Sequence, residues 1–110
     1  MIRSEHITEL NVLCPGARTF VEGGITYIYL PNLKLPAGYQ PPEVDALLRP
    51  GTGPDGYTSR LFLSAAFPHK GQNWTIHHIL GRTWHTFSFN SVPGDLRPIE
   101  ILANHLRVLQ

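Results

Sequence analysis

The feature that most restricts this chain is the close spacing of its glycines and prolines. Ten glycines and ten prolines are distributed over 110 residues. Glycine supplies the backbone angles that tight turns require, and proline removes a donor from a sheet ladder. This punctuation is typical of a fold with many short strands joined by turns.

Composition bounds the class of protein. Hydrophobic residues make up 42% of the chain, which is enough for a core, but 110 residues are too few for two independent cores. We therefore expect one domain over residues 1–110. The net charge of +1, without a run of Lys or Arg, predicts neither nucleic acid nor a membrane as a partner. Because Met1–His6 is polar and lacks the apolar core of a signal peptide, the sequence predicts a cytoplasmic protein.

Alternating and β-branched residues predict strands in the first part of the chain. Gly23-Gly24 is the expected turn of a hairpin between Arg18–Val21 and Ile25–Leu30, and Pro31 is expected to end the second strand. The Pro-rich crossing that follows contains one short strand, at the edge or in the centre of the sheet, and the Asp55-Gly56 turn precedes another. These two strands are expected at Val44–Leu48 and Tyr57–Ala65.

A second hairpin is predicted from Trp74 to Phe89, with Gly81-Arg82 as a type II′ loop. This loop pairs His77 with Thr86 and His78 with His85. Two sets of side chains then alternate between the faces of the sheet. One face carries Thr75, His77, Ile79, Trp84, Thr86 and Ser88, and the other carries Ile76, His78, Leu80, His85, Phe87 and Phe89.

The end of the chain has the spacing of an amphipathic helix. Asp95 is a candidate cap, and Pro98 is tolerated in the first helical turn. The expected apolar stripe consists of Ile99, Leu102, Ala103, Leu106 and Leu109. The predicted fold class is therefore α+β, an antiparallel β-meander sheet covered by a C-terminal helix.

Several short motifs resemble one prokaryotic family related to ubiquitin-conjugating (UBC) enzymes. The matching stretches run in the order LP-x-GY, DLL-like, GYP-like, Trp-x-x-Trp-Ser-like and a closing helix that includes His105-Leu106. They are Leu35–Tyr39, Val44–Leu48, Pro54–Tyr57, Trp84–Ser88, where Phe87 stands for the second Trp, and Pro98–Leu109. The resemblance implies a UBC-like fold from a bacterial ubiquitin-like conjugation operon. The implied partners are a ubiquitin-like protein and its activating enzyme.

The chain departs from conventional conjugating enzymes in its cysteine. Their nucleophile follows the meander, whereas the single cysteine here is Cys14, before the meander. The His-Pro-Asn element of those enzymes is also missing in that order. Pro68-His69 and Asn73 resemble it only loosely. A thioester at the usual place is therefore excluded, and Cys14 is expected to be a small buried or turn-proximal residue.

A hydroxyl is the remaining candidate nucleophile for acyl transfer. Ser88 falls at the serine of the family's Trp-x-x-Trp-Ser stretch, and the predicted register places it one diagonal step from His77. His77 would remove the proton, because a serine hydroxyl needs a neighbouring base. Thr86 and Ser91 are the next candidates, and Asn90 or backbone N–H groups near residues 93–95 are possible oxyanion donors. The function predicted first is transfer of a ubiquitin-like protein through an oxyester.

Two alternatives stay open. One is a catalytically inactive UBC-like adaptor that only binds a ubiquitin-like protein, since a fold does not establish an activity. The other is a small metal-binding β-rich protein, in which the predicted pair His78 and His85 takes a third ligand from elsewhere. That third ligand would be His69, His105 or Cys14. No cofactor is expected, because the chain has no phosphate-binding glycine loop.

Overall fold

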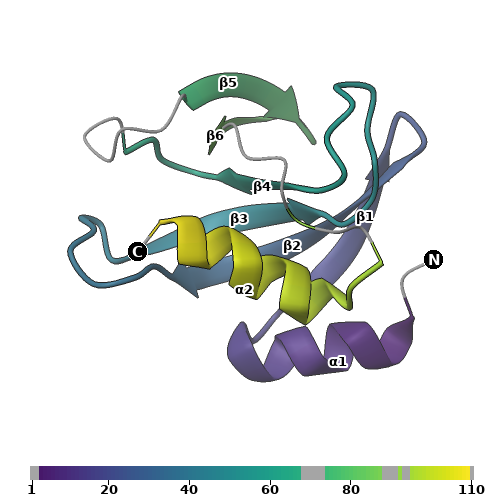
Figure 1. Cartoon of the computed structure of the whole chain (residues 1–110), viewed down its shortest axis with the longest axis horizontal. Coiled ribbons are helices and arrows are strands. Elements are labelled where there is room, and N and C mark those ends of the chain that lie inside the picture. Colours follow the sequence, from purple (N-terminus) through teal and green to yellow (C-terminus); the bar gives the residue numbers. More distant parts are fainter. Residues whose placement is uncertain (1–2, 68–73, 88–91, 93–94, 110) are drawn as a thin grey trace.

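The computed structural model describes residues 3–67, 74–87, 92 and 95–109 and has an α+β fold (Figure 1). The sheet is antiparallel and six-stranded, in the order β1-β2-β3-β4-β6-β5. Its strands are β1 (Arg18–Glu22), β2 (Ile25–Lys34), β3 (Glu43–Arg49), β4 (Arg60–Leu63), β5 (Trp74–Ile79) and β6 (Arg82–Phe87). The first four strands form a meander. The β5–β6 hairpin then extends the sheet, with β6 next to β4 and β5 at the edge.

Two helices pack on one face of this sheet. They are α1 (Ser4–Leu13) and α2 (Pro98–Val108), and α2 lies across the sheet with α1 beside it (Figure 1). Leu10 of α1 and Leu102 of α2 are fully buried in a core that also contains Ile28, Leu30, Ala46, Leu48, Leu61, Leu63 and Phe87 from the strands. The hydroxyl of Tyr39 donates to the Leu109 carbonyl at 2.7 Å and so fixes the end of α2.

The opposite face has its own buried cluster although neither helix reaches it. Tyr27, Leu47, Phe62, Ile79 and Trp84 form this cluster. The first and the second hairpin meet on this side of the sheet. The N–H of Leu80, in the loop between β5 and β6, donates to Oε1 of Glu22, at the end of β1, at 3.0 Å. A strongly curled sheet can bury apolar side chains on its inner face in this way, much as a barrel does. We call this side of the sheet the helix-free face.

The strand predictions are confirmed in position and corrected in length. β3 is a central strand, as its nearly continuous burial requires, and β2 continues through Pro31 to Lys34. The pairing of β2 with β3 is irregular between Leu30 and Leu33. A bulge of this kind tolerates a proline, so Pro31 does not end the strand. β4 covers only Arg60–Leu63 of the longer strand expected there.

The predicted register of the second hairpin is wrong by two residues. His77 lies opposite Trp84, and Thr75, not His77, lies opposite Thr86. The loop is Leu80-Gly81, with φ of 56° and 71°, which is the type I′ geometry that matches strand twist. Trp84 Nε1 donates to the Ile79 carbonyl at 3.1 Å and supports this turn. A shift of two residues leaves each described side chain on its predicted face.

The C-terminal helix is confirmed, but its cap and its buried side are different. Its N-cap is Arg97 rather than Asp95, and the Glu100 carboxylate accepts the Arg97 N–H at 3.0 Å. The buried residues include Ile101 and His105, whereas Ala103 of the expected stripe is exposed. The α1 helix was not predicted at all.

Candidate functional site

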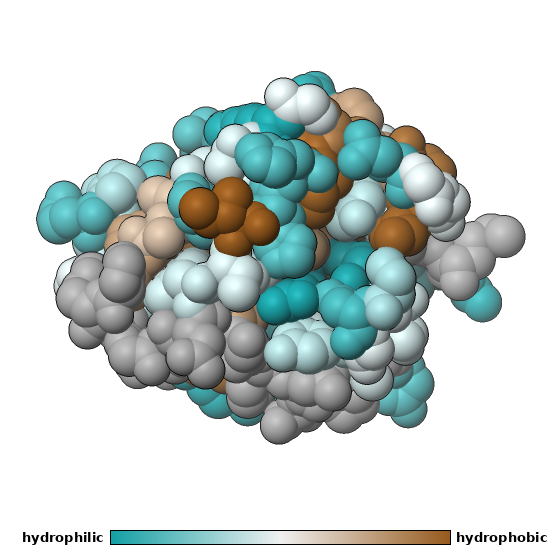
Figure 2. Space-filling model, turned by 90° about the horizontal axis from the view of Figure 1, so that it is seen from above, coloured by the Kyte–Doolittle hydropathy of each residue, from teal (hydrophilic) through white to brown (hydrophobic). Residues whose placement is uncertain are grey.

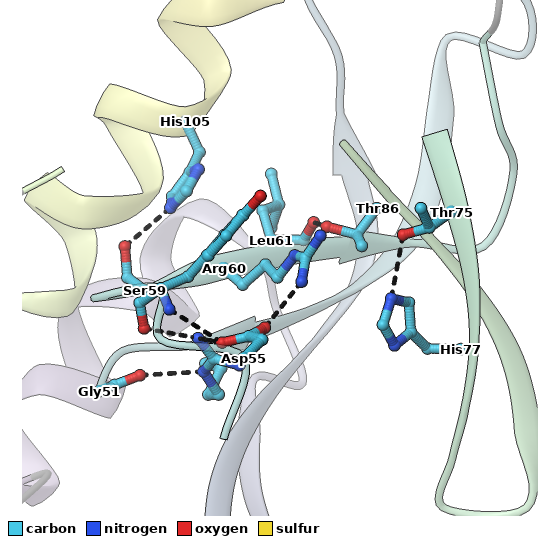
Figure 3. Close-up of polar contacts among 11 residues, drawn as sticks. Gly51, Asp55, Ser59, Arg60, Leu61, Thr75, His77, Thr86 and His105 are labelled. Carbon is cyan, nitrogen blue, oxygen red and sulfur yellow. Dashed lines mark hydrogen bonds and ion pairs between the residues drawn. The ribbon is translucent and has the colours of Figure 1, made fainter. Parts of the chain in front are cut away.

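The predicted nucleophiles fall into two groups. Ser88, the first candidate, lies outside the described residues, as do Ser91 and Asn90. Thr86 is fully buried, and its hydroxyl donates to the Leu61 carbonyl at 2.7 Å (Figure 3). A hydroxyl held in this way satisfies a backbone acceptor and is closed to a substrate.

His77, the predicted base, lies on the half-buried outer part of the helix-free face. Its Nε2 is hydrogen-bonded to the Thr75 hydroxyl at 3.0 Å, and its ring meets Phe62 edge-on with centroids 5.4 Å apart. Burial lowers the pKa of His77, and the nearby Arg60 guanidinium lowers it further. The imidazole is therefore neutral near pH 7 and able to accept a proton. The structure does not bring it to Thr86, its predicted partner.

A second pair of hydroxyl and imidazole was not predicted. Ser59 Oγ and His105 Nε2 are 2.9 Å apart, between the start of β4 and the buried side of α2 (Figure 3). Both side chains are 1% exposed. Burial lowers the pKa of His105 to about 4, and Arg49 contributes to the shift. This pair has the composition of a catalytic dyad, but it is sealed inside the core.

A cluster of three charged side chains lies between the two pairs. The Asp55 carboxylate binds both ends of the Arg49 guanidinium at 3.0 Å and also binds Arg60 at 2.7 Å. Both arginine side chains are almost fully buried. Although burial raises it, the pKa of Asp55 is held below its usual range by hydrogen bonds from Arg49, from the Tyr57 N–H and from Arg60. The sequence indicated only a turn at Asp55.

An open hollow lies on the helix-free face, where the first hairpin approaches the second. It has a volume of about 190 Å³, and we call it the aromatic groove. Its lining consists of Arg18, Phe20, Tyr29, Leu80, Arg82 and Trp84. The rings meet edge to face, with centroids 6.2 Å apart for Phe20 and Tyr29 and 6.4 Å apart for Tyr29 and Trp84.

Two guanidinium groups flank these rings. Arg82 lies 4.7 Å from the Trp84 ring and forms an ion pair with Asp45 at 3.0 Å. Arg18 lies 5.4 Å from the Phe20 ring and 5.3 Å from the Tyr29 ring. Within the described part of the chain, no carboxylate forms an ion pair with Arg18. The aromatic groove therefore combines apolar rings with one uncompensated positive charge.

A larger hollow of about 400 Å³ lies near the start of α2. It is lined by His6, by the β1–β2 turn, by Arg49–Thr52 and by Leu96 and Pro98. The Arg49 side chain at this hollow already binds the Gly51 carbonyl, Asp55 and the Tyr57 carbonyl. Its donors are therefore engaged within the protein.

The other predicted chemistry is not assembled among these residues. His78 lies opposite Thr83 and His85 opposite Ile76, so the two histidines are not the direct partners that the sequence predicted. Across residues 3–67, 74–87, 92 and 95–109, no group of three or more potential ligands is placed to hold a metal ion. Cys14 is buried, as expected, and burial raises the pKa of its thiol. Neither described helix combines the length and the apolar character that crossing a membrane requires.

Comparisons of the chain with models of protein families, with curated proteins and with solved structures found no match. What the chain does is therefore inferred from its own residues.

Proposed function

We propose that the chain is a catalytically inactive UBC-like adaptor that binds a ubiquitin-like protein in a bacterial conjugation pathway. The observation that carries this proposal is the aromatic groove, an open and partly apolar hollow on the helix-free face. The sequence motifs between Leu35 and Leu109 supply the expected class of partner.

The surroundings of the groove suit protein binding. Phe20, which lines the groove, is 36% exposed although it is a large hydrophobic residue. Val21, on the other face of the same edge strand, is 66% exposed. Aromatic and arginine side chains are enriched in protein interfaces, and here both kinds meet in one hollow. Seen from the β5 side, hydrophobic residues stand singly or in small groups among hydrophilic ones (Figure 2). The groove thus has the aromatic and arginine side chains that are typical of a protein contact.

The described nucleophilic groups favour binding over catalysis. The Ser59–His105 pair is sealed, the Thr86 hydroxyl is engaged and the Cys14 thiol is buried. A burial that raises the pKa of a thiol also removes its thiolate, which is the reactive form.

A titration with a bacterial ubiquitin-like protein tests the adaptor function. We expect saturable binding, measured by calorimetry, that Phe20→Ser weakens about tenfold, as loss of an aromatic interface side chain does. Val12→Ser is the matched control, because Val12 is 85% exposed on α1, away from the groove. Absence of binding, or equal weakening by both substitutions, contradicts the proposal.

A second function, acyl transfer through an oxyester on Ser88, is favoured by one observation. His77 is accessible, its pKa is lowered and it lies on the hairpin whose last strand ends at Phe87, directly before Ser88. A neutral imidazole can accept the proton of a serine hydroxyl and so activate it as a nucleophile. The corrected register places His77 opposite Trp84, four positions before Ser88 in the chain instead of the predicted two. Because a general base must lie within hydrogen-bond reach of the proton that it removes, the oxyester function stands second to the adaptor.

Incubation with the activating enzyme, the ubiquitin-like protein and ATP tests this second function. Transfer predicts a covalent adduct that resists thiol reductant, yields to hydroxylamine and disappears in Ser88→Ala. In that step the serine oxygen bonds to the terminal carbonyl carbon of the ubiquitin-like protein and displaces the thiol of the activating enzyme, and the serine proton passes to the base. Cys14→Ser is the matched control and should form the adduct normally. A complex without any adduct supports the adaptor instead.

A further inference from the structure

We propose that an extended acidic segment of the partner protein adds as an antiparallel strand to the free edge of β1. One apolar side chain of this segment enters the aromatic groove, and a carboxylate two residues later binds Arg18. The identity of the partner rests on the proposed function, whereas the chemistry of the segment rests on the edge strand and the groove.

β1 is one of the two edge strands of the sheet, and among the described residues it pairs with β2 alone. All five residues of the strand, Arg18–Glu22, are exposed. The β5–β6 loop approaches the strand at its end, where the N–H of Leu80 donates to the side chain of Glu22. Natural proteins often protect such an edge with charged side chains, proline or a bulge. Here the charges stand at the two ends of the strand, Arg18 and Glu22. The three residues between them include no charge and no proline, and the pairing of β1 with β2 is regular.

The register identifies the backbone groups that would receive the new strand. Glu22 and Ile25 close a hairpin with the two-residue loop Gly23-Gly24. Hydrogen-bonded and non-hydrogen-bonded pairs alternate from that point, so the N–H and C=O groups of Thr19 and Val21 point away from β2. An antiparallel segment can pair with both residues, which is strand addition as a mode of peptide recognition.

The size of the aromatic groove is suited to one side chain of a partner and is too small for a cofactor. Its volume of about 190 Å³ is below the roughly 300–1,000 Å³ that is usual for small-molecule sites. Arg18 and Phe20 of the groove lie on the same face of β1, because side chains alternate along a strand. A residue opposite Phe20 in the added strand would therefore lie over the groove.

The charge of Arg18 indicates which second residue of the added segment is recognised. Arg82 is compensated by Asp45, and Glu22 accepts the N–H of Leu80, but no described carboxylate pairs with Arg18. In an antiparallel strand the residue opposite Arg18 comes two positions after the residue opposite Phe20. The favoured segment therefore has an apolar residue followed two positions later by Asp or Glu.

Synthetic peptides test the sequence rule without any change to the protein. The probe is a fluorescent ten-residue peptide of threonine and valine with one central leucine and a glutamate two positions after it. We expect a twin with glutamine, and a twin with glutamate moved by one position, to bind about fivefold more weakly by anisotropy, as loss of an exposed ion pair allows. Equal affinity of the three peptides overturns the proposal.

Backbone pairing is tested with N-methylated versions of the same peptide. Methyl groups on the alternate residues that face β1 should abolish binding, whereas methyl groups on the other set should leave it nearly unchanged. Two sets that behave alike would overturn strand addition. On the protein, Arg18→Gln should remove the preference for glutamate over glutamine. Ile76→Thr is the matched control on the other edge strand, where Ile76 is 62% exposed, and it should leave binding unchanged.

The whole ubiquitin-like protein separates the two proposals. If the peptides obey the sequence rule but the ubiquitin-like protein does not bind, the strand-addition site stands and the proposed function fails. If the ubiquitin-like protein binds equally well to wild type and Arg18→Gln and does not compete with the peptide, the proposed function stands and strand addition fails as its mode.

Discussion

Two pairs of hydroxyl and imidazole lie on opposite sides of the charged cluster of Arg49, Asp55 and Arg60 (Figure 3). The distance from oxygen to nitrogen is nearly the same in both pairs, but their surroundings differ. Ser59 and His105 are 2.9 Å apart, and Thr75 and His77 are 3.0 Å apart. The first pair is buried between β4 and α2, whereas Thr75 is exposed and His77 half-buried on β5. The same two functional groups are thus part of the core in one place and of the surface in the other.

This difference shows that the burial of such a pair, and not the identity of its two side chains, decides what the pair can do. Burial is the main cause of the lowered pKa in both histidines, and Arg49 acts on both. Only His77 is also within reach of solvent and hence of a partner. The buried pair contributes to stability, and the exposed pair is available for binding or proton transfer. Four experiments probe this contrast.

The largest effect is expected from Asp55→Asn, which changes the charged cluster between the two pairs. It leaves Arg49 and Arg60, both almost fully buried, without the carboxylate that compensates them. We expect the free energy of unfolding in urea at pH 7 to fall by about 3 kcal/mol. Asp45→Asn is the control, since it breaks the more exposed Arg82 pair and should cost less than about 1 kcal/mol. A similar loss in both variants would remove the distinction between buried and exposed charges.

Acid should affect the buried histidine more than the half-buried one. The pKa of His105 falls from 6.5 when unfolded to about 4 when folded, so between these values the unfolded chain binds a proton that the folded chain does not. Stability is therefore unaffected by this group above pH 6.5 and decreases as the pH falls toward 4, by about 3 kcal/mol at most. Urea unfolding at several pH values should show a slope over this window that His105→Leu reduces clearly and His77→Gln largely retains. An unchanged slope in His105→Leu would contradict the assignment.

Removal of one hydroxyl should also separate the two pairs. Ser59→Ala deletes a buried hydrogen bond to His105 and should lower the free energy of unfolding by about 1–2 kcal/mol. The measurement is again urea unfolding at pH 7, where His105 is neutral. A loss below about 0.3 kcal/mol would indicate that the contact is not part of the stabilising core.

The smallest effect is expected from Thr75→Ala, the corresponding change at the surface. Thr75 is exposed, so the free energy of unfolding should change by less than about 0.5 kcal/mol. NMR titration of the His77 ring provides the readout that stability does not. Loss of the hydroxyl should shift the His77 titration and leave that of His105 in place. A shift of both would show that the pairs are coupled through the charged cluster.

Local pattern was sufficient for most of the fold. The β-branched residues of β2, the apolar run of β3 and the spacing of α2 predicted these elements at nearly their observed positions. The α1 helix was missed because only Leu10 among its residues is buried, while Val12 and Leu13 are exposed. A helix with so narrow an apolar stripe carries little periodic signal.

The candidate site was less predictable, because it is formed by contacts between residues that lie far apart in the sequence. The hairpin loop was placed one position late, since Leu80 adopts a positive φ that its side chain disfavours. Its N–H bond to Glu22, 58 residues away, supports that turn, and no local pattern contains this contact. Asp55 was recognised only as a turn residue. The two arginines that make it a charge centre come from different strands, β3 and β4.

The hydrogen bond between Glu22 and Leu80 also has a consequence for the strength of binding at the aromatic groove. It ties the tip of one hairpin to the tip of the other, with the aromatic groove beside it. The walls of this hollow are thus held in position before any ligand arrives, so that an incoming segment orders mainly itself. Preorganisation of this kind reduces the entropy lost on association. A protein without Glu22 could keep every residue of the hollow and still bind more weakly.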